Sequence, residues 1–189
     1  INTIIQKYQN NIRLTSVYRE RYAINQEICD MIDELDRKIL ELLQSDARIP
    51  NSEIAKQIGI VPSATAERIK KLVQRGIIAG YDLRLNAKSV ELGLVAFIFV
   101  KADEPVNDCS TALELAKIPE VLEIHNIAGE DCYLLKARVR DAESLGKFLR
   151  EKVGTIPTVK NTRTVIALET FKENGPLPLD EAMKGKLYD

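Results

Sequence analysis

Residues 51–76, NSEIAKQIGIVPSATAERIKKLVQRG, decide the fold of the N-terminal half of the chain. Apolar side chains recur along this stretch at helical spacing: Ile54, Ala55, Ile58, Ile69, Leu72 and Val73. Gly59 suits the left-handed conformation that ends a helix, Pro62 suits the first turn of the next helix, and Gly76 is expected to end that helix. We therefore expect one helix that Asn51 or Ser52 caps, and a second helix that starts at Pro62.

A third helical pattern precedes this stretch. Its apolar stripe consists of Leu35, Ile39, Leu42 and Leu43. Asp33 and Glu34 lie at its start, where the helix dipole favours acidic side chains, and Pro50 prevents its continuation. Two helices around a short glycine turn, braced by a preceding helix, form the helix-turn-helix layout. Residues 33–80 are therefore predicted to form a helix-turn-helix domain.

The outer surface of this predicted domain is basic. Segment 61–88 carries six basic residues against two acidic ones, a local charge of +4 in a chain whose net charge is −1. Cationic side chains on one face neutralise DNA phosphates, and small side chains at a helix N-terminus leave room to reach base edges. The candidate DNA contacts are Asn51, Ser52, Ser63, Thr65, Arg68, Lys70, Lys71 and Arg75.

These candidates have different expected roles. Ser63 and Thr65 lie where a recognition helix meets base edges, although Thr65 is equally compatible with a core position. Arg68 suits either a bidentate contact to guanine or a phosphate contact. The remaining candidates are expected on backbone phosphates: Lys70, Lys71, Arg75 and, at a helix N-terminus, Asn51 or Ser52. A basic helix face is also ordinary solvated surface, so periodicity alone leaves DNA binding open.

The C-terminal half contains strand and helix patterns. Residues 95–100, VAFIFV, have no polar alternation, which indicates a strand buried on both faces. Three further strand patterns follow, at residues 121–127, 133–139 and 159–170. Asp108 and Asp141 can cap two helices, whose predicted apolar stripes are Cys109, Ala112, Leu113 and Ala116, and Leu145, Phe148 and Leu149.

The resulting order, β-α-β-β-α-β, predicts a ferredoxin-like unit and an α+β fold class for the chain. The two helices of such a unit cover one face of the sheet. A second copy of the chain is the simplest cover for the other face, so we expect a dimer through this half.

The same patterns divide the chain into five regions. They are an N-terminal extension at 1–32, the helix-turn-helix domain at 33–80, a linker strand and hinge at 81–91, the ferredoxin-like domain at 92–170, and a tail at 171–189. The extension has apolar residues at helical spacing and four basic residues. An added helix and an unstructured tail are both compatible with it.

Composition excludes several kinds of site. An odd number of cysteines, three, without a CxxC spacing argues against a disulfide framework and a cysteine-based zinc site, and indicates a reducing cytoplasm. His125 is the only histidine, which excludes histidine-rich metal sites; its strand position is more typical of a surface or interface residue than of a ligand. No apolar run approaches the roughly 18 residues of a membrane span. We expect no metal and no cofactor.

Five separated motifs occur in order: DELDRKIL at 33–40, DARI at 46–49, ERIKKL at 67–72, GIIAGY at 76–81 and NTRT at 161–164. Together they resemble the Lrp/AsnC family, the leucine-responsive or feast/famine regulators of bacteria and archaea. The resemblance covers about residues 33–170 and implies a winged helix-turn-helix joined through a short strand, Tyr81–Leu85, to an effector domain. It also implies dimers that often assemble into octamers, with amino-acid effectors bound at subunit interfaces near the second hairpin.

The resemblance places the effector site around the hairpin that contains Gly129. The family motif there is Gly-x-x-Asp-Tyr, whereas this chain has Cys132 at the acidic position. The acidic group that would hold an effector's amino group is therefore lost or moved to Asp131 or Glu130. Two threonines of the last strand share one face by alternation, although threonines are also ordinary strand residues. The predicted effector-binding residues are Asn126, Gly129, Glu130, Asp131, Cys132, Tyr133, Thr162 and Thr164.

Two other departures from the family pattern concern the helix caps and the chain start. Pro50 and Val61 stand where the family often has a capping serine, and residues 1–32 extend beyond the usual start. We predict a sequence-specific DNA-binding transcription regulator, not an enzyme, whose partners are double-stranded DNA, a small effector and further copies of the chain.

Two alternatives come from other classes of protein. Siroheme decarboxylases resemble the family and keep a degenerate DNA-binding half, but they depend on histidines, and His125 is alone in this chain. An assembly module with a vestigial DNA surface is the other alternative. Salt-dependent DNA affinity would separate such a module from a regulator.

Overall fold

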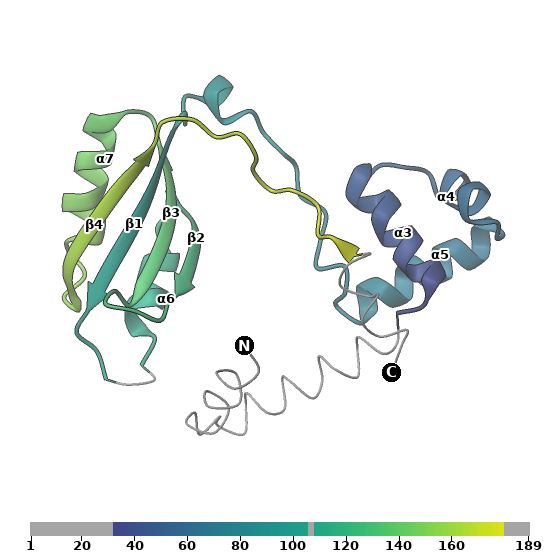
Figure 1. Cartoon of the computed structure of the whole chain (residues 1–189), viewed down its shortest axis with the longest axis horizontal. Helices are drawn as coiled ribbons and strands as arrows, with labels where there is room; N and C mark the ends of the chain where they lie inside the picture. Colours follow the sequence, from purple (N-terminus) through teal and green to yellow (C-terminus); the bar gives the residue numbers. More distant parts are fainter. Residues whose placement is uncertain (1–31, 106–107, 180–189) are drawn as a thin grey trace. The chain divides into compact units, whose positions relative to one another are not determined.

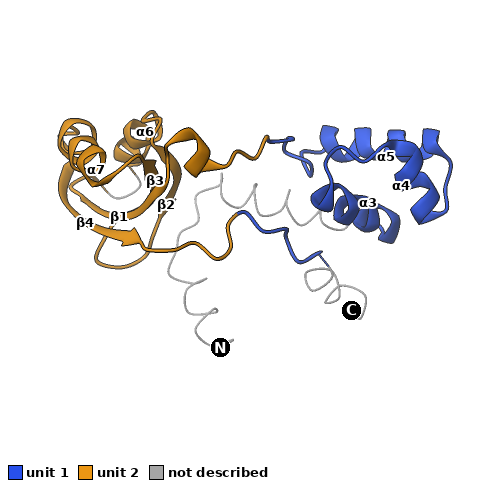
Figure 2. Ribbon diagram, turned by 90° about the horizontal axis from the view of Figure 1, so that it is seen from above, with its two compact units in different colours: residues 1–82, 174–189 blue, residues 83–173 orange. Residues whose placement is uncertain are grey.

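The computed structural model of the protein describes residues 32–105 and 108–179, which fall into two compact units (Figure 2). The second unit is Leu83–Glu173, and the first unit contains the described residues on either side of it. The helix predicted for the N-terminal extension lies outside the described residues.

Three helices around a small apolar core make up the first unit (Figure 1). They are α3 (Glu34–Ser45), α4 (Asn51–Ile58) and α5 (Pro62–Gln74). The apolar core cluster has one fully buried residue from each helix, Ile39, Ile54 and Leu72, and Ala55 of α4 and Thr65 of α5 are fully buried as well. Helices of this length are marginal alone in water, so the shared apolar contacts stabilise them. The predicted helix-turn-helix layout is confirmed.

The ends of the helices show why the chain turns where it does. Asp33 caps α3 in a capping box, and its carboxylate accepts the N–H of Asp36 at 2.8 Å. Gly59 and Gly76 have φ values of 76° and 72°, a left-handed conformation that glycine adopts without a steric penalty. Both glycines therefore end their helices as predicted.

The start of α4 differs from expectation, whereas α5 begins at Pro62 as predicted. Their N-caps are Pro50 and Val61, and neither side chain makes a capping hydrogen bond. The prediction that Asn51 or Ser52 caps α4 is wrong, because both residues lie inside the first turn of the helix. The first backbone N–H groups of these two helices therefore have no side-chain cap.

The buried face of α5 is rotated relative to the predicted one. Thr65 and Leu72 are buried and Ile69 is half-buried, so spacings of four and three residues define the inner face. Val73 was expected in the core, but it is 46% exposed. It follows Leu72 directly and so lies about 100° further around the helix.

The second unit contains a four-stranded antiparallel sheet with strand order β2-β3-β1-β4. Its elements, in chain order, are β1 (Leu94–Ala102), α6 (Ser110–Ala116), β2 (Val121–Asn126), β3 (Tyr133–Val139), α7 (Ala142–Phe148) and β4 (Val159–Ala167). A 3₁₀ turn (Ala87–Val90) precedes β1, and a π-helical turn (Leu149–Val153) follows α7. The predicted ferredoxin-like order is confirmed.

The sheet has one face covered by α6 and α7, and we call the opposite face the open face. The register places these residues on the open face: His125, Leu134, Phe99 and Arg163 in the first row from the β2–β3 hairpin, and Glu123, Lys136, Phe97 and Val165 in the next. Phe97 is 36% exposed. On the same face Val95 is buried and Phe99 is half-buried, so the expectation that β1 is buried on both faces holds only in part within one chain.

The two helices meet the sheet through different residues than the sequence indicated for α6. Thr111 and Leu115 are its buried residues, whereas Leu113, placed in the predicted stripe, is 65% exposed. The prediction for α7 is confirmed at its start, because the Asp141 carboxylate accepts the N–H of Ser144 at 2.7 Å.

The segments that flank the sheet unit are extended. The predicted strand Tyr81–Leu85 is not formed among the described residues, and Tyr81, Leu83 and Leu85 are exposed. After β4, the carboxylate of Glu173 contacts Lys136 Nζ and Arg138 Nη2, both at 2.7 Å.

Further along, the backbone of Leu177 exchanges two hydrogen bonds with the Gln44 side chain of α3. The Leu177 N–H donates to Gln44 Oε1 at 2.7 Å, and its carbonyl accepts from Gln44 Nε2 at 3.3 Å. The first unit is thus built from two separate stretches of chain. None of the helices in the described part of the chain is long and apolar enough to cross a membrane.

Candidate DNA-binding and effector surfaces

Most of the predicted DNA contacts lie on the outside of the first unit. These exposed candidates are Asn51, Ser52, Ser63, Lys70, Lys71 and Arg75. Lys71 lies 3.9 Å from Glu67, a separation that leaves its ammonium largely solvated. Because α4 and α5 start without capping side chains, their first N–H groups and positive dipole ends add to this cationic surface.

Thr65 does not belong to this surface. The residue is fully buried, and its hydroxyl lies 3.4 Å from the carbonyl oxygen of Val61, the residue that precedes α5. A side chain in this position cannot reach a base edge. Of the two roles that the sequence left open for Thr65, the structure shows the core position, and its inclusion among DNA contacts is wrong.

Arg68 is half-buried and points to α3. Its Nη1 donates to Asp33 Oδ2 at 2.7 Å and to Asp36 Oδ1 at 2.8 Å. These two bonds raise the pKa of the guanidinium, with the bond to Asp36 the larger cause. The cation of Arg68 is therefore used to hold α5 against the N-terminal end of α3.

The ion pair with Arg68 also changes the pKa of Asp33. Burial raises the pKa of its carboxyl, but the backbone N–H of Asp36 and the Arg68 guanidinium outweigh burial and hold the pKa below the ordinary value. The sequence missed this ion pair because its partners are 35 residues apart in the chain. The acidic start of α3 and the lone arginine midway along α5 were its visible signals.

The predicted effector residues fall into two groups on the sheet. Asn126 and Tyr133 are register partners at the hairpin end of β2 and β3. Thr162 occupies the same row on β4, but Val100 of β1 stands between. Two strand spacings, roughly 10 Å, therefore separate Thr162 from Tyr133, and a single chain does not bring the two groups together.

Tyr133 is turned into the unit and away from solvent. It is almost fully buried, and its hydroxyl donates a hydrogen bond to Glu104. Burial, followed by the hydrogen bond to Glu104 and then by the negative charge of that residue, raises the pKa of the phenol well above its usual range. The polar end of Tyr133 is occupied within the chain, so this residue supports the hairpin from beneath.

Glu104 also holds the start of α6. Its Oε2 accepts the N–H of Thr111 at 3.1 Å and the Thr111 hydroxyl at 2.6 Å. Burial raises the pKa of this carboxyl, but the bonds from Thr111 and Tyr133 outweigh it and the pKa is lowered. Glu104 thus ties α6 to β3 beside the hairpin.

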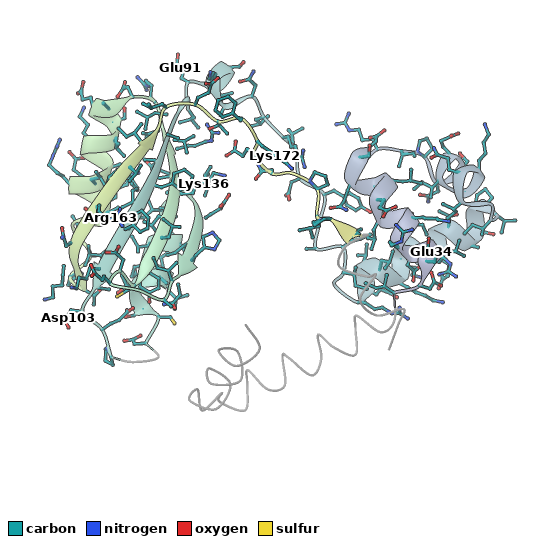
Figure 3. All side chains as sticks on the ribbon, in the orientation of Figure 1. Glu34, Glu91, Asp103, Lys136, Arg163 and Lys172 are labelled. Carbon is teal, nitrogen blue, oxygen red and sulfur yellow. The ribbon has the colours of Figure 1, made fainter. Side chains whose placement is uncertain are left out.

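The hairpin itself presents Asp131 outward and Cys132 inward. The thiol of Cys132 lies 3.4 Å from the N–H of Ala102 and 3.6 Å from its carbonyl oxygen. Asp131 Oδ2 instead lies 3.2 Å from Nη2 of Arg163, a β4 residue labelled in Figure 3. Exposed Gly129 and Glu130 complete the turn. Asp131 is therefore the acidic group that this hairpin offers on the open face.

Arg163 is a functional candidate that the sequence analysis did not single out. It lies between Thr162 and Thr164, so strand alternation places it on the opposite face from the two predicted threonines. Its guanidinium carbon lies 3.8 Å from the centroid of the Phe99 ring. Its place in the NTRT motif was the available signal.

Metal binding is not supported by any side-chain cluster in the described ranges. Among residues 32–105 and 108–179, no group of three or more His, Cys, Asp or Glu side chains is arranged to hold a metal ion.

Comparison with known proteins matches each unit to a domain model. A model of the Lrp/AsnC ligand binding domain matches residues 95–177, and a winged helix-turn-helix DNA-binding model matches residues 32–79. The HTH-type transcriptional regulator FL11 of Pyrococcus horikoshii is 36% identical over 148 residues, 78% of this chain and 97% of the relative. The leucine-responsive regulatory protein of Escherichia coli is 34% identical over 148 residues, 77% of this chain and 90% of the relative.

Solved structures agree with these relatives. A transcriptional regulator from Neisseria meningitidis, crystallised in complex with L-Met, superposes with a TM-score of 0.73 at 31% sequence identity, covering 80% of this chain and 99% of the other. Two domain models in the expected order, and relatives above 30% identity along most of the chain, show that it belongs to the Lrp/AsnC family of DNA-binding transcription regulators.

Proposed function

We propose that this regulator binds operator DNA as a dimer, in the cytoplasm, and that an amino acid bound to the sheet unit changes its operator preference. The observation that carries the DNA part is the exposed cationic side of α5, which begins without a side-chain cap. In a dimer, two such helices enter successive major grooves about one helical turn apart.

The exposed residues of α4 and α5 have two different roles in DNA binding. Ser63, in the first turn of α5, is small enough to let the helix end approach base edges. Lys70, Lys71 and Arg75 contact the sugar-phosphate backbone, as do Asn51 and Ser52 at the start of α4. The phosphate contacts supply affinity for any sequence, and the contact at Ser63 contributes to specificity.

The dimer forms through the open face of the sheet. Phe97 and Val165 are neighbours in one row there, 36% and 48% exposed, and Phe99 and Leu134 occupy the row beside them. An apolar strip of this kind on a sheet face is an interaction surface, and a second copy offers a self-complementary partner. Octamers are assemblies of such dimers.

The effector is an amino acid bound near the hairpin. The solved relative from Neisseria meningitidis, which was crystallised with L-Met, supports this class of ligand. The effector alters DNA binding by the difference between its affinities for the two assembly states. Residues of a second chain complete the site, because Thr162 and Thr164 lie apart from the hairpin group in one chain.

Salt-dependent DNA binding tests the first part of the proposal. Fluorescence anisotropy with the DNA upstream of the chain's own gene should give log-log salt plots of negative slope. The double variant Lys70→Gln/Lys71→Gln removes two phosphate contacts, so the slope should become shallower by about 1.8. The matched control, Lys117→Gln/Lys147→Gln, removes two exposed lysines of the sheet unit and should leave the slope unchanged. Equal slopes for both double variants would exclude α5 as the DNA surface.

Thermal denaturation tests the second part. A ligand that binds only the folded protein raises the melting temperature. Screening the twenty amino acids should identify at least one that stabilises the sheet unit. If none raises the melting temperature at millimolar concentration, the effector is not an amino acid.

A further inference from the structure

We infer that Glu67 of α5 reads one base of the operator, and that its carboxylate accepts a hydrogen bond from the N4 amino group of a cytosine in the major groove. The inference rests on the DNA binding proposed above. It assigns a specificity-determining residue, because the lysines and Arg75 of the cationic surface give affinity for any sequence.

The position of Glu67 on α5 is the first part of the argument. Thr65 and Leu72 are the buried residues of the helix and mark its inner side. Glu67 follows Thr65 by two residues, which is about 200° around the helix, so it lies on the outer side. Ser63 lies one turn before it on that side, since residues four apart are neighbours on a helix surface. A major groove that receives this side of α5 therefore brings both residues to the base edges.

The charge of Glu67 is opposite to that of its surroundings. It is the only acidic residue within Pro62–Gln74, whereas Lys70, Lys71 and, directly after the helix, Arg75 are cationic. DNA phosphates attract these cations and repel a carboxylate. Glu67 therefore weakens binding to DNA in general, and a favourable contact has to come from a base that donates a hydrogen bond.

Contacts within the chain do not explain an acidic residue at this position. The carboxylate of Glu67 lies 3.9 Å from Lys71 Nζ, and both side chains are 55% exposed. An exposed pair at this separation contributes little to stability. The neighbouring Arg68 is bound by Asp33 and Asp36 and does not require Glu67. The carboxylate is therefore available to a partner outside the chain.

The chemistry of the base pairs selects cytosine as that partner. A carboxylate only accepts hydrogen bonds, and the major groove offers two kinds of donor, the amino groups of cytosine and adenine. The adenine amino group lies between two acceptors, its own N7 and thymine O4, whereas cytosine N4 has an acceptor, guanine O6, on one side. Each acceptor beside the donor repels the carboxylate, so cytosine is favoured over adenine.

Selection from a random DNA pool with the full chain identifies the operator positions at which base identity matters. Fluorescence anisotropy with all four base pairs at each position of one half-site then measures each preference. For wild-type protein we expect one position at which C·G binds about ten-fold more tightly than the other pairs.

Two variants of Glu67 test the assignment at that position. Glutamine offers a donor and an acceptor, the pattern that pairs with adenine N6 and N7, so Glu67→Gln should change the preference from C·G to A·T. Alanine offers neither, so Glu67→Ala should bind the four base pairs alike. Both variants should bind unrelated DNA more tightly than wild type, because a charge that phosphates repel is lost.

A third variant controls for the change in net charge. Glu53→Gln removes the same charge from the first turn of α4. It should keep the C·G preference, because Glu53, whose carboxylate accepts a hydrogen bond from Gln57 at 3.2 Å, is not assigned to a base. Circular dichroism confirms that each variant is folded.

The possible failures overturn different claims. If wild-type protein enriches a sequence and both Glu67 variants keep every base preference, the assignment is wrong while the proposed function stands. A change in affinity that is equal for all base pairs also overturns the assignment, since Glu67 would then act through its charge alone. If wild-type protein enriches no sequence, sequence-specific DNA binding fails and the assignment falls with it.

Discussion

Replacing Arg68 by methionine removes the cation that α5 places between two carboxylates of α3. Asp33 is about half exposed, so the loss of its ion pair costs about 0.5 kcal/mol. Asp36 is only 6% exposed, and the loss of a hydrogen bond to a buried charge costs about 2 kcal/mol. The first unit should therefore lose about 2.5 kcal/mol of stability.

Hydrogen exchange is the assay that isolates this unit. Amides of α3 and α5 that exchange through unfolding of the three-helix unit should exchange roughly 70-fold faster in the variant. Amides of the sheet unit report on a separate core and should keep their rates. Lys56→Met, which removes an exposed cation of α4, is the matched control and should change neither set.

Two further measurements decide whether Arg68 holds α5 against α3 or contacts a DNA phosphate. Adding Asp36→Leu to Arg68→Met should recover part of the loss, because no charge then remains buried without a partner. The salt slope of DNA binding should stay at the wild-type value, since Arg68 is not assigned to a phosphate. Unchanged exchange in α3 and α5, or a slope shallower by about 0.9, would refute the reasoning.

Three other predictions concern acid stability, assembly and the support of the hairpin. The folded pKa of Asp33 lies below its ordinary value of 3.8, so its stabilisation is complete above about pH 4 and is lost as the pH falls through the folded pKa. Circular dichroism should therefore show a weaker acid dependence for Asp33→Asn, and an unchanged one contradicts the pairing with Arg68. Phe97→Glu should convert dimers to monomers in sedimentation velocity, whereas Leu113→Glu, on exposed helix surface, should not. Tyr133→Phe should lower the stability of the sheet unit by about 1 kcal/mol in urea titrations, because its carboxylate partner loses one donor; equal midpoints would argue against that role.

The elements that the sequence specified well are those whose signals are local. Gly59 and Gly76 end helices by their own conformational freedom, and the apolar residues of α3 repeat over three turns. The alternation of apolar residues predicted the bounds of β3, residues 133–139, correctly. Each of these signals is read within about ten residues, so no knowledge of distant contacts is required.

The predictions of buried residues fail in two situations. In one, a short helix has few residues to define its inner face; in the other, a buried polar side chain makes its hydrogen bond with a group that the sequence pattern does not reveal. α6 has seven residues, and its buried Thr111 is tolerated because Glu104 accepts hydrogen bonds from its N–H and its hydroxyl, and the hydroxyl also bonds to that of Thr158. Thr65 is buried on α5 in the same way, with its hydroxyl near a carbonyl of the preceding turn. The sequence left the position of Thr65 open, and it gave no signal that Thr111 is buried.

The candidate site was predictable only in part for a related reason. The hairpin residues are contiguous, and the resemblance located them. The pairing of Asp131 with Arg163 joins the hairpin to a strand at the other edge of the sheet, and Phe99 of the central strand orients it. Strand order and register decide such a meeting, and neither follows from the residues at position 131 or 163 alone.

The hydrogen bonds between Gln44 and Leu177 have a practical consequence for dissecting the protein. Because the three-helix unit takes in chain from both sides of the sheet unit, a fragment that stops at Asp82 omits the backbone to which Gln44 is bonded. Such a truncated fragment leaves that glutamine to water, and its stability would underestimate that of the unit in the intact chain. A circularly permuted fragment, with residues 174–179 fused ahead of α3, would restore the contact and give the faithful reference.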